Sequence, residues 1–258
     1  MTVATHHRFE EAVNRARPDL SLVPCQELVE KLRAVKEPEE VRLIEQAARV
    51  ADHAFQQVAS RLQEGVTEKE VAWELEKAMR QMGSQALPFD VIVASGPNAA
   101  LPHARPGDRP LRRGEPVVID MGARIDGYCS DMTRTIWLGG ADEKLRQVYS
   151  VVLQAQATAL AGIRAGLTGQ QADAIGRQVI EEAGYGRHFG HSLGHGVGLA
   201  EHELPQVGPN ADNTLADGMV LTVEPGIYLP GWGGVRIEDL AIIENGALRL
   251  LSAAPKMK

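Results

Sequence analysis

The spacing of apolar residues predicts a long amphipathic helix over residues 38–64. Its apolar positions recur every three or four residues along one face: Val41, Ile44, Ala48, Ala51 and Phe55. Pro38 suits the first turn of this helix, where a missing N–H costs nothing. Gly65 is expected to end the helix, because glycine is common just past a helix C-terminus.

A second helix is predicted over residues 67–82. Thr67 and Glu70 have the spacing of a capping box, in which each side chain bonds the backbone N–H of the other residue. Gly83 follows the last apolar position and is expected to close the helix. The two predicted helices therefore form a pair joined by a short turn.

This helix pair recurs 101 residues further along the chain. The matched positions are Gly65 with Gly166, Thr67 with Thr168, and Gly83 with Gly184. Coincidence is one explanation, since glycine and threonine caps are common, but a duplicated half explains the matches better. After each pair the apolar period changes to two, as in "EPVVIDMGARI" and "GMVLTVEPGIYL". We therefore predict an α+β fold made of two helix–helix–sheet halves.

Composition narrows the class of protein. Of 258 residues, 44% are hydrophobic and 24% charged, as in ordinary globular domains, and the tryptophans Trp73 and Trp137 are expected in the core. A formal net charge of −7 argues against a general nucleic-acid or membrane-surface binder. The chain has two cysteines and its start lacks the apolar segment of a signal peptide, so a cytoplasmic location is expected.

Four acidic residues lie on strand-like segments in two similar pairs. Asp120 and Asp131 flank a hairpin-like turn in the first half, and Glu224 and Glu238 occupy apolar runs in the second. Carboxylates placed side by side repel each other unless a cation lies between them. The alternative is that Arg134 or Arg236 neutralises single acids, although two arginines do not match four carboxylates.

The segment "HFGHSLGHGVGLAEHE", residues 188–203, holds four of the eight histidines. Its closely spaced glycines disfavour a helix and allow the backbone to approach a ligand closely, so we expect an extended strand that aligns His191, His195 and His202. One imidazole with four carboxylates is a donor set for divalent Mn, Co, Zn or Fe, with carboxylates bridging two ions.

These segments resemble metallopeptidase family M24, specifically the Xaa-Pro branch of prolidase and aminopeptidase P. The resemblance covers about residues 36–246 and rests on "IDMGARIDGYCSDMTRT", "HSLGHGVGLAEHE", "TVEPGIY" and "GGVRIEDLAII". It implies the pita-bread fold, in which the two halves are related by a pseudo-two-fold axis. It also implies five metal ligands: Asp120, Asp131, His195, Glu224 and Glu238.

The resemblance implies further roles around two divalent ions, manganese first. Glu224 is expected to act as general base as well as ligand, and His202 to lie near the scissile carbonyl. His103 and His191 are expected to line the substrate cleft, and Arg236 to lie beside the metals. The implied reaction is hydrolysis of an N-terminal Xaa-Pro bond in a dipeptide or short peptide through a metal-bridging hydroxide, by a homodimer.

Two departures from the family pattern qualify these expectations. Residues 1–35 are expected to be a lead-in segment, the remnant of an N-terminal domain, before a catalytic domain at 36–258. Gln206 stands where prolidases often carry an arginine that grips a dipeptide carboxylate, so strict dipeptide selection by that route is not expected. Competing functions on this fold are metal-free C–N hydrolysis of creatinase type and non-catalytic peptide binding, which the full ligand set disfavours.

Overall fold

The computed structural model describes residues 2–257, and the chain divides into two compact units, Met1–Leu32 and Arg33–Lys258. The first unit contains helix α1 (Val3–Ala16), which begins where the Thr2 hydroxyl accepts a hydrogen bond from the Thr5 amide at 3.2 Å. None of the α1 residues is buried. Helix α2 (Leu28–Ala34) continues into the second unit.

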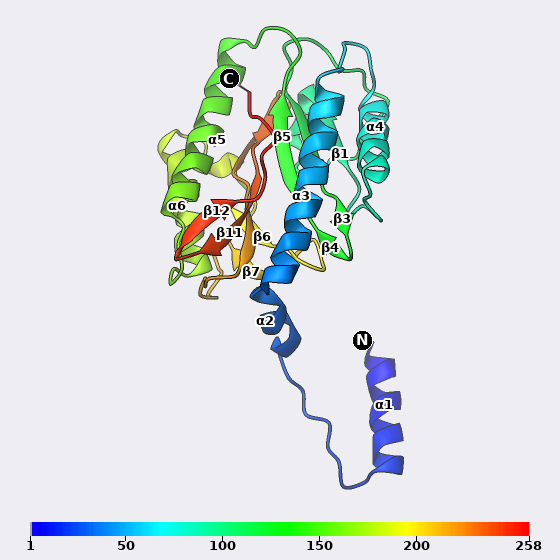
Figure 1. Cartoon of the computed structure of the whole chain (residues 1–258). Helices are drawn as coiled ribbons and strands as arrows, with labels where there is room; N and C mark the ends of the chain where they lie inside the picture. The colour runs from blue at the N-terminus through cyan, green and yellow to red at the C-terminus, as the bar shows by residue number, and fades with distance from the viewer. Residues whose placement is uncertain (1, 258) are drawn as a thin grey trace. The chain divides into compact units, whose positions relative to one another are not determined.

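The second unit combines four long helices with twelve strands (Figure 1). The helices are α3 (Pro38–Ala59), α4 (Glu68–Gln81), α5 (Glu143–Gly162) and α6 (Gly169–Glu182). The first-half strands are β1 (Ile92–Ser95), β2 (Val117–Met121), β3 (Arg124–Ile125), β4 (Tyr128–Cys129) and β5 (Met132–Ile136). The second-half strands are β6 (Gly194–Gly196), β7 (Glu203–Val207), β8 (Val220–Val223), β9 (Gly226–Leu229), β10 (Gly233–Arg236), β11 (Asp239–Glu244) and β12 (Ala247–Leu250). Two 3₁₀ helices, η1 (Gly96–Ala100) and η2 (Gly186–His188), complete the unit.

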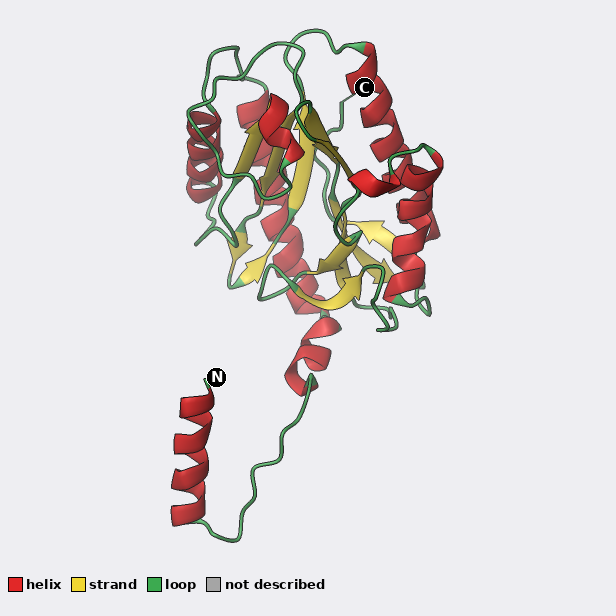
Figure 2. Ribbon diagram, turned by 180° about the vertical axis from the view of Figure 1, so that it is seen from behind, coloured by secondary structure: helices red, strands yellow, loops and turns green. Residues whose placement is uncertain are grey.

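Each half of the unit contains one main antiparallel sheet. The first has the order β1-β2-β5, and the second has the order β12-β11-β8-β6-β7. Strands β9 and β10 pair separately, as do β3 and β4. Within this unit the strands lie between α4 on one side and the α5–α6 pair on the other (Figure 2). Helix α3 also packs on the second sheet, because Val41 and Ile44 cluster with Val220 of β8 and Leu240 of β11.

The halves repeat each other in detail, as the sequence predicts. Helices α4 and α6 begin at positions 68 and 169 and end at 81 and 182, so the offset of 101 holds at both ends. Thr67 and Thr168 are the N-caps, each with a complete capping box. The equivalent backbone bonds also recur, since the amide at 68 donates to Arg109 O at 3.1 Å and the amide at 169 donates to Asn213 O at 2.9 Å.

Each half has its own apolar core, formed where its helices pack on its strands. Phe55, Leu75 and Met121 are buried in the first core. Val152, Ile180 and Val235 are buried in the second. The amphipathic pattern of the sequence therefore identifies the faces that pack inward.

Two details of the helices differ from the sequence prediction. Helix α3 ends at Ala59 rather than at position 64, because Ser60 caps it and Gly65, at φ +92°, forms the turn before α4 instead. Trp73 is 60% exposed rather than in the core. The buried positions of α4 include Val71 and Leu75, and Trp73 lies between them on the other side of the helix.

Candidate metal centre

Five side chains from both halves converge next to the sheets. Asp120 lies on β2, Asp131 directly precedes β5, and His195 is the central residue of β6. Glu224 directly follows β8, and Glu238 lies between β10 and β11. The two halves meet here, since the Glu238 amide donates to the Thr133 carbonyl of β5 at 3.1 Å.

Short distances join four of these side chains in one cluster, and Asp120 lies beside it in contact with Arg236. His195 Nε2 is 3.3 Å from Glu224 Oε1 and 3.6 Å from Asp131 Oδ2. Asp131, His195 and Glu238 each offer a ligand atom within 4.8 Å of the other two. The structure therefore contains a group that could hold a metal ion, as the sequence spacing indicates.

The tautomer of His195 favours a cation in this position. Its Nδ1 lies 3.1 Å from the carbonyl oxygen of Gly196, which can only accept, so Nδ1 carries the proton of this hydrogen bond. Burial lowers the pKa of His195 to about 3, so the ring is neutral near pH 7. Its Nε2 lone pair then faces carboxylate oxygens, an arrangement that a metal ion stabilises.

The raised pKa values of the carboxylates indicate that this group lacks neutralising positive charge. Burial raises the pKa of Glu224 to about 8, and burial together with neighbouring carboxylates raises the pKa of Asp131 and of Glu238 well above their ordinary values. Buried oxygens Oδ1 of Asp120 and Oδ1 of Asp131 have no hydrogen-bond partner among the described residues. Divalent cations among these oxygens would supply the missing partners and stabilise the charges, so the residues fit a metal.

Arg236 neutralises only part of the cluster. Its Nη2 lies 2.6 Å from Asp120 Oδ2, and its Nε donates to Thr133 Oγ1 at 3.1 Å. Thr133 in turn donates to Glu238 Oε2 at 2.6 Å. Arg134 instead pairs with Asp239 at 2.7 Å and donates to the backbone carbonyl of Glu238, so its guanidinium is engaged by other partners than the four carboxylates.

Tyr228 links Arg236 to His191. The Tyr228 hydroxyl accepts from Arg236 Nη1 at 2.8 Å and lies 2.8 Å from His191 Nε2, while His191 Nδ1 lies 2.8 Å from the Ser192 carbonyl. Burial lowers the pKa of His191 to about 4, which makes its ring neutral and leaves Nε2 to accept the hydroxyl proton. Sequence reasoning missed Tyr228, although it stands in the quoted segment "TVEPGIY".

The histidines do not share one strand, which corrects the sequence expectation. Only His195 lies on β6, whereas His191 precedes this strand and His202 lies in the bend before β7. The His202 ring nevertheless packs edge-to-face on the His195 ring, with centroids 4.0 Å apart. His103 is exposed after η1.

Ion pairs hold the histidine segment at both of its ends. Arg177 of α6 pairs with Asp173 at 2.6 Å and donates to the His191 carbonyl at 2.7 Å. At the other end, the Glu203 carboxylate forms one ion pair with Lys36 Nζ at 2.8 Å and a second with Arg33. Nothing in the local sequence indicates that Lys36 would pair with a residue so far along the chain.

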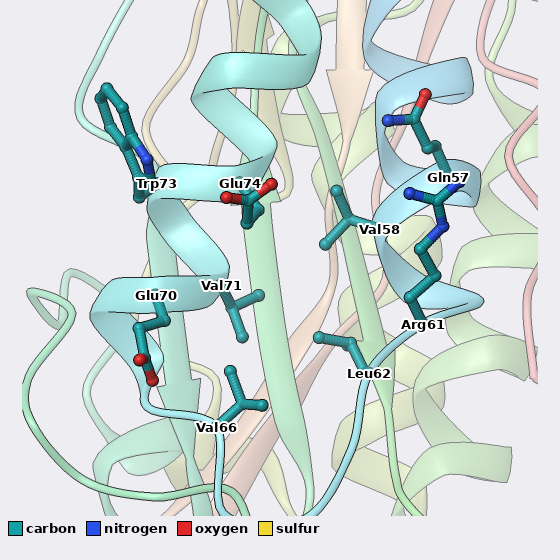
Figure 3. A pocket seen from close by; sticks show the side chains of 9 residues that line it. All are labelled: Gln57, Val58, Arg61, Leu62, Val66, Glu70, Val71, Trp73 and Glu74. Carbon is teal, nitrogen blue, oxygen red and sulfur yellow. The ribbon is translucent and has the colours of Figure 1, made fainter.

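A cavity of about 340 Å³ lies elsewhere, between α3 and α4 (Figure 3). Its floor is apolar and its rim is polar, with Val58, Leu62 and Val71 pointing inward and Trp73 at one edge. All its lining residues fall within positions 57–74. The cavity therefore offers apolar packing rather than the ligand chemistry of the carboxylate cluster.

Within residues 2–257, every helix is too short or too polar to cross a membrane.

Comparison with known proteins places these features in a family. A model described as "Metallopeptidase family M24" matches residues 42–245. The chain is 44% identical over 256 residues to "Uncharacterized peptidase YqhT" of Bacillus subtilis, covering 99% of this chain and 71% of that protein. It is 46% identical over 225 residues to an "Xaa-Pro dipeptidase" of Pyrococcus furiosus, covering 87% of this chain and 65% of that protein. The chain thus spans about two thirds of the length of these curated relatives.

Solved structures agree with the sequence comparison. The structure described as "Xaa-Pro dipeptidase from Bacillus anthracis" superimposes with a TM-score of 0.95 at 45% identity. That match covers 100% of this chain and 71% of the other.

Proposed function

The chain belongs to metallopeptidase family M24, and from this membership we propose that it hydrolyses the bond between an N-terminal residue and a following proline. It has the pita-bread fold of the α+β class, so the sequence-based assignments of family and fold are confirmed. Its substrates would be Xaa-Pro dipeptides or short peptides with proline at the second position. The names of its relatives support this substrate class.

The proposed metal ligands are Asp120, Asp131, His195, Glu224 and Glu238, which would hold two divalent ions, manganese first and Co, Zn or Fe as alternatives. The observation that carries this proposal is the neutral His195, whose Nε2 faces buried carboxylates at 3.3 and 3.6 Å. Four carboxylates match the charge of two divalent cations. Bound there, the ions would polarise the peptide carbonyl and acidify water.

Side chains of this protein would then accept the proton and position the substrate. Glu224 would take the proton of the attacking water at its carboxylate, since it lies beside His195 and its free oxygen faces His191 at 3.9 Å. His202 packs on the ring of a proposed ligand and would stabilise the carbonyl oxygen as it gains charge. His191 is oriented by Tyr228 and, with His103, would line the substrate side. Arg236 would keep Asp120 in place through their 2.6 Å contact.

The cellular setting and the assembly stay predictions. Cys25 and Cys129 are free cysteines, which agrees with the proposed cytoplasmic location. Leu28, Val29 and Leu32 of α2 are exposed apolar side chains, which supports a surface available to a second copy in a homodimer. Light scattering of the purified chain tests the dimer.

The experiment that tests the function removes all metal with a chelator and assays Ala-Pro and Ala-Pro-Ala, with Mn, Co or Zn added back. We expect hydrolysis only after metal is restored, and its loss in Asp131→Ala and Glu238→Ala. Glu244→Ala is the matched control, because Glu244 ends β11 on the exposed surface. Metal-independent turnover of another C–N substrate would favour the creatinase-type alternative. Peptide binding without cleavage would favour the binding module.

A further inference from the structure

Glu68 is a fully buried carboxylate that the proposed chemistry does not use. It is the first residue of α4, and its exposed fraction is 0%. Acidic residues in the first turn of a helix usually face solvent, as Glu70 does on the same turn. A buried carboxylate is costly unless hydrogen bonds satisfy it, so its partners indicate what it does.

Its partners come from both ends of one loop. Oε1 accepts from the Ser95 amide and the Ser95 hydroxyl, each at 2.8 Å, and Oε2 accepts from the Gly107 amide at 3.0 Å. The Asn98 side-chain amide donates to both oxygens at 3.1 Å. One carboxylate therefore joins the start and the end of residues 95–107.

This loop faces the candidate metal centre. Its middle holds His103, and the Pro102 carbonyl accepts from Arg236 Nη1 at 3.3 Å. Arg236 also contacts Asp120 at 2.6 Å, so a two-step chain of contacts leads from the loop to a proposed ligand. Strand β10 packs closely against the loop, because a Cβ at Gly234 would overlap the Ala99 carbonyl.

The described residues of the second half have no such arrangement. The position equivalent to Glu68, at the 101-residue offset, is Gly169. A Cβ at Gly169 would overlap the carbonyl oxygen of Gln206 on β7, so this site has no room for a side chain. The carboxylate at position 68 is therefore an addition to the repeated framework, and it serves the one loop that carries His103.

We propose that Glu68 is a positioning residue that fixes loop 95–107 as the substrate-side wall of the metal centre. This inference rests on the proposed Xaa-Pro hydrolysis for its functional consequence. Glu68 would act through the loop and not through the metal ions, because its partners are Ser95, Asn98 and Gly107. Its removal should therefore affect how substrate binds more than how the bound substrate reacts.

Glu68→Gln is the sharpest substitution because it preserves size. All four groups that contact the carboxylate are donors, and a carboxylate accepts at both oxygens whereas an amide accepts at only one. The glutamine NH₂ must then face the Ser95 amide or the Gly107 amide, and one end of the loop loses its acceptor. Glu70→Gln is the matched control, since it removes the same charge from the same helical turn on the exposed side.

The first measurement is hydrogen–deuterium exchange, followed by peptide mass, in the wild type, Glu68→Gln and Glu70→Gln. We expect exchange to rise at least roughly tenfold in residues 95–107 of Glu68→Gln, with no change there in Glu70→Gln. Unchanged exchange in Glu68→Gln overturns the proposal. Asn98→Ala is the second variant, because it removes the contact between Asn98 and the carboxylate while Glu68 itself stays unchanged. We expect faster exchange of the loop in this variant too.

The second measurement is steady-state kinetics on Ala-Pro with manganese. We expect KM to rise roughly tenfold in Glu68→Gln while kcat changes less than about threefold. A fall in kcat at unchanged KM, or equal effects of Glu68→Gln and Glu70→Gln, contradicts a positioning role. A wild type without Xaa-Pro hydrolysis overturns the proposed function instead, and the exchange measurement still decides whether Glu68 holds the loop.

Discussion

The Arg236 guanidinium lies 2.6 Å from Asp120 Oδ2, while Asp120 Oδ1 is buried without a hydrogen-bond partner among the described residues. Arginine thus satisfies one oxygen of this carboxylate and leaves the other for a second cation. The contact also explains why arginine alone does not neutralise the cluster, since Asp131 and Glu238 keep pKa values well above normal despite the guanidinium.

Replacing Arg236 with methionine should destabilise the metal-free protein more than the metal-loaded protein. The change leaves Asp120 buried without its guanidinium, which typically costs about 3–5 kcal/mol of unfolding free energy. Divalent ions would recover part of this loss. Urea unfolding in EDTA and in manganese measures both values. Arg249→Met is the control, because Arg249 pairs with Glu45 and Glu244 at the surface and should cost under about 1 kcal/mol. Equal losses with and without metal would contradict the prediction.

The unfolding free energy of the metal-free protein should fall as the pH rises from about 6.5 to about 8, above the range in which the lowered pKa values of His191 and His195 act in the opposite direction. Glu224 has a pKa of about 8 in the folded state against an ordinary 4.5, so the folded protein holds a proton there that the unfolded chain releases. Asp131 and Glu238 act in the same direction. The loss should be on the order of 1 kcal/mol per pH unit for each carboxyl. Denaturation curves across this range check it, and saturating manganese should remove the fall.

Gly198→Ala should displace the ion pair that holds the segment carrying His202. An alanine Cβ at this position would overlap Glu203 Oε1 and come within 3.1 Å of Lys36 Cε. We expect a loss of roughly 2–4 kcal/mol of unfolding free energy, because Glu203 and Lys36 are buried with side chains 7% and 1% exposed. Gly190→Ala is the matched control, since an added Cβ there has no atom of the other described residues within 4 Å, its chain neighbours aside. Similar stability of the two variants would exclude the clash.

Thr67→Ala and Thr168→Ala should cost nearly the same. Each hydroxyl caps its helix, accepting from Glu70 N at 3.3 Å and from Gln171 N at 3.1 Å. Loss of such a cap typically costs about 1 kcal/mol. Chemical denaturation of the two single variants compares the loss of unfolding free energy at the two equivalent caps. A difference above about 1 kcal/mol would show that the caps have diverged in their contribution.

The fold was predictable where local chemistry repeats. The capping boxes at Thr67 and Thr168 and the glycines at 65 and 166 mark equivalent helix pairs, and the structure places α4 and α6 101 residues apart at both ends. The end of α3 was not predictable in this way. Residues 60–64 have good helix-forming side chains, yet α3 ends at Ala59. The residues after it form the turn that places Thr67 as the N-cap of α4.

The cluster was predictable because strand-borne carboxylates and a glycine-rich histidine segment are rare, locally visible features. The structure brings Asp131, His195 and Glu238 within 4.8 Å, although their metal-binding roles stay predictions. The supporting contacts were not predictable. Lys36–Glu203 and Glu68–Gly107 join residues that are distant in sequence, and no periodicity or spacing distinguishes these charges from solvated ones.

The most direct test of the proposed metal centre is anomalous diffraction from crystals of this chain grown with manganese. The account predicts two anomalous peaks about 3.5–4 Å apart, in contact with Asp120, Asp131, His195, Glu224 and Glu238. Peaks confined to other surfaces, or a cluster of the same five side chains with no bound manganese at saturating concentration, would contradict it.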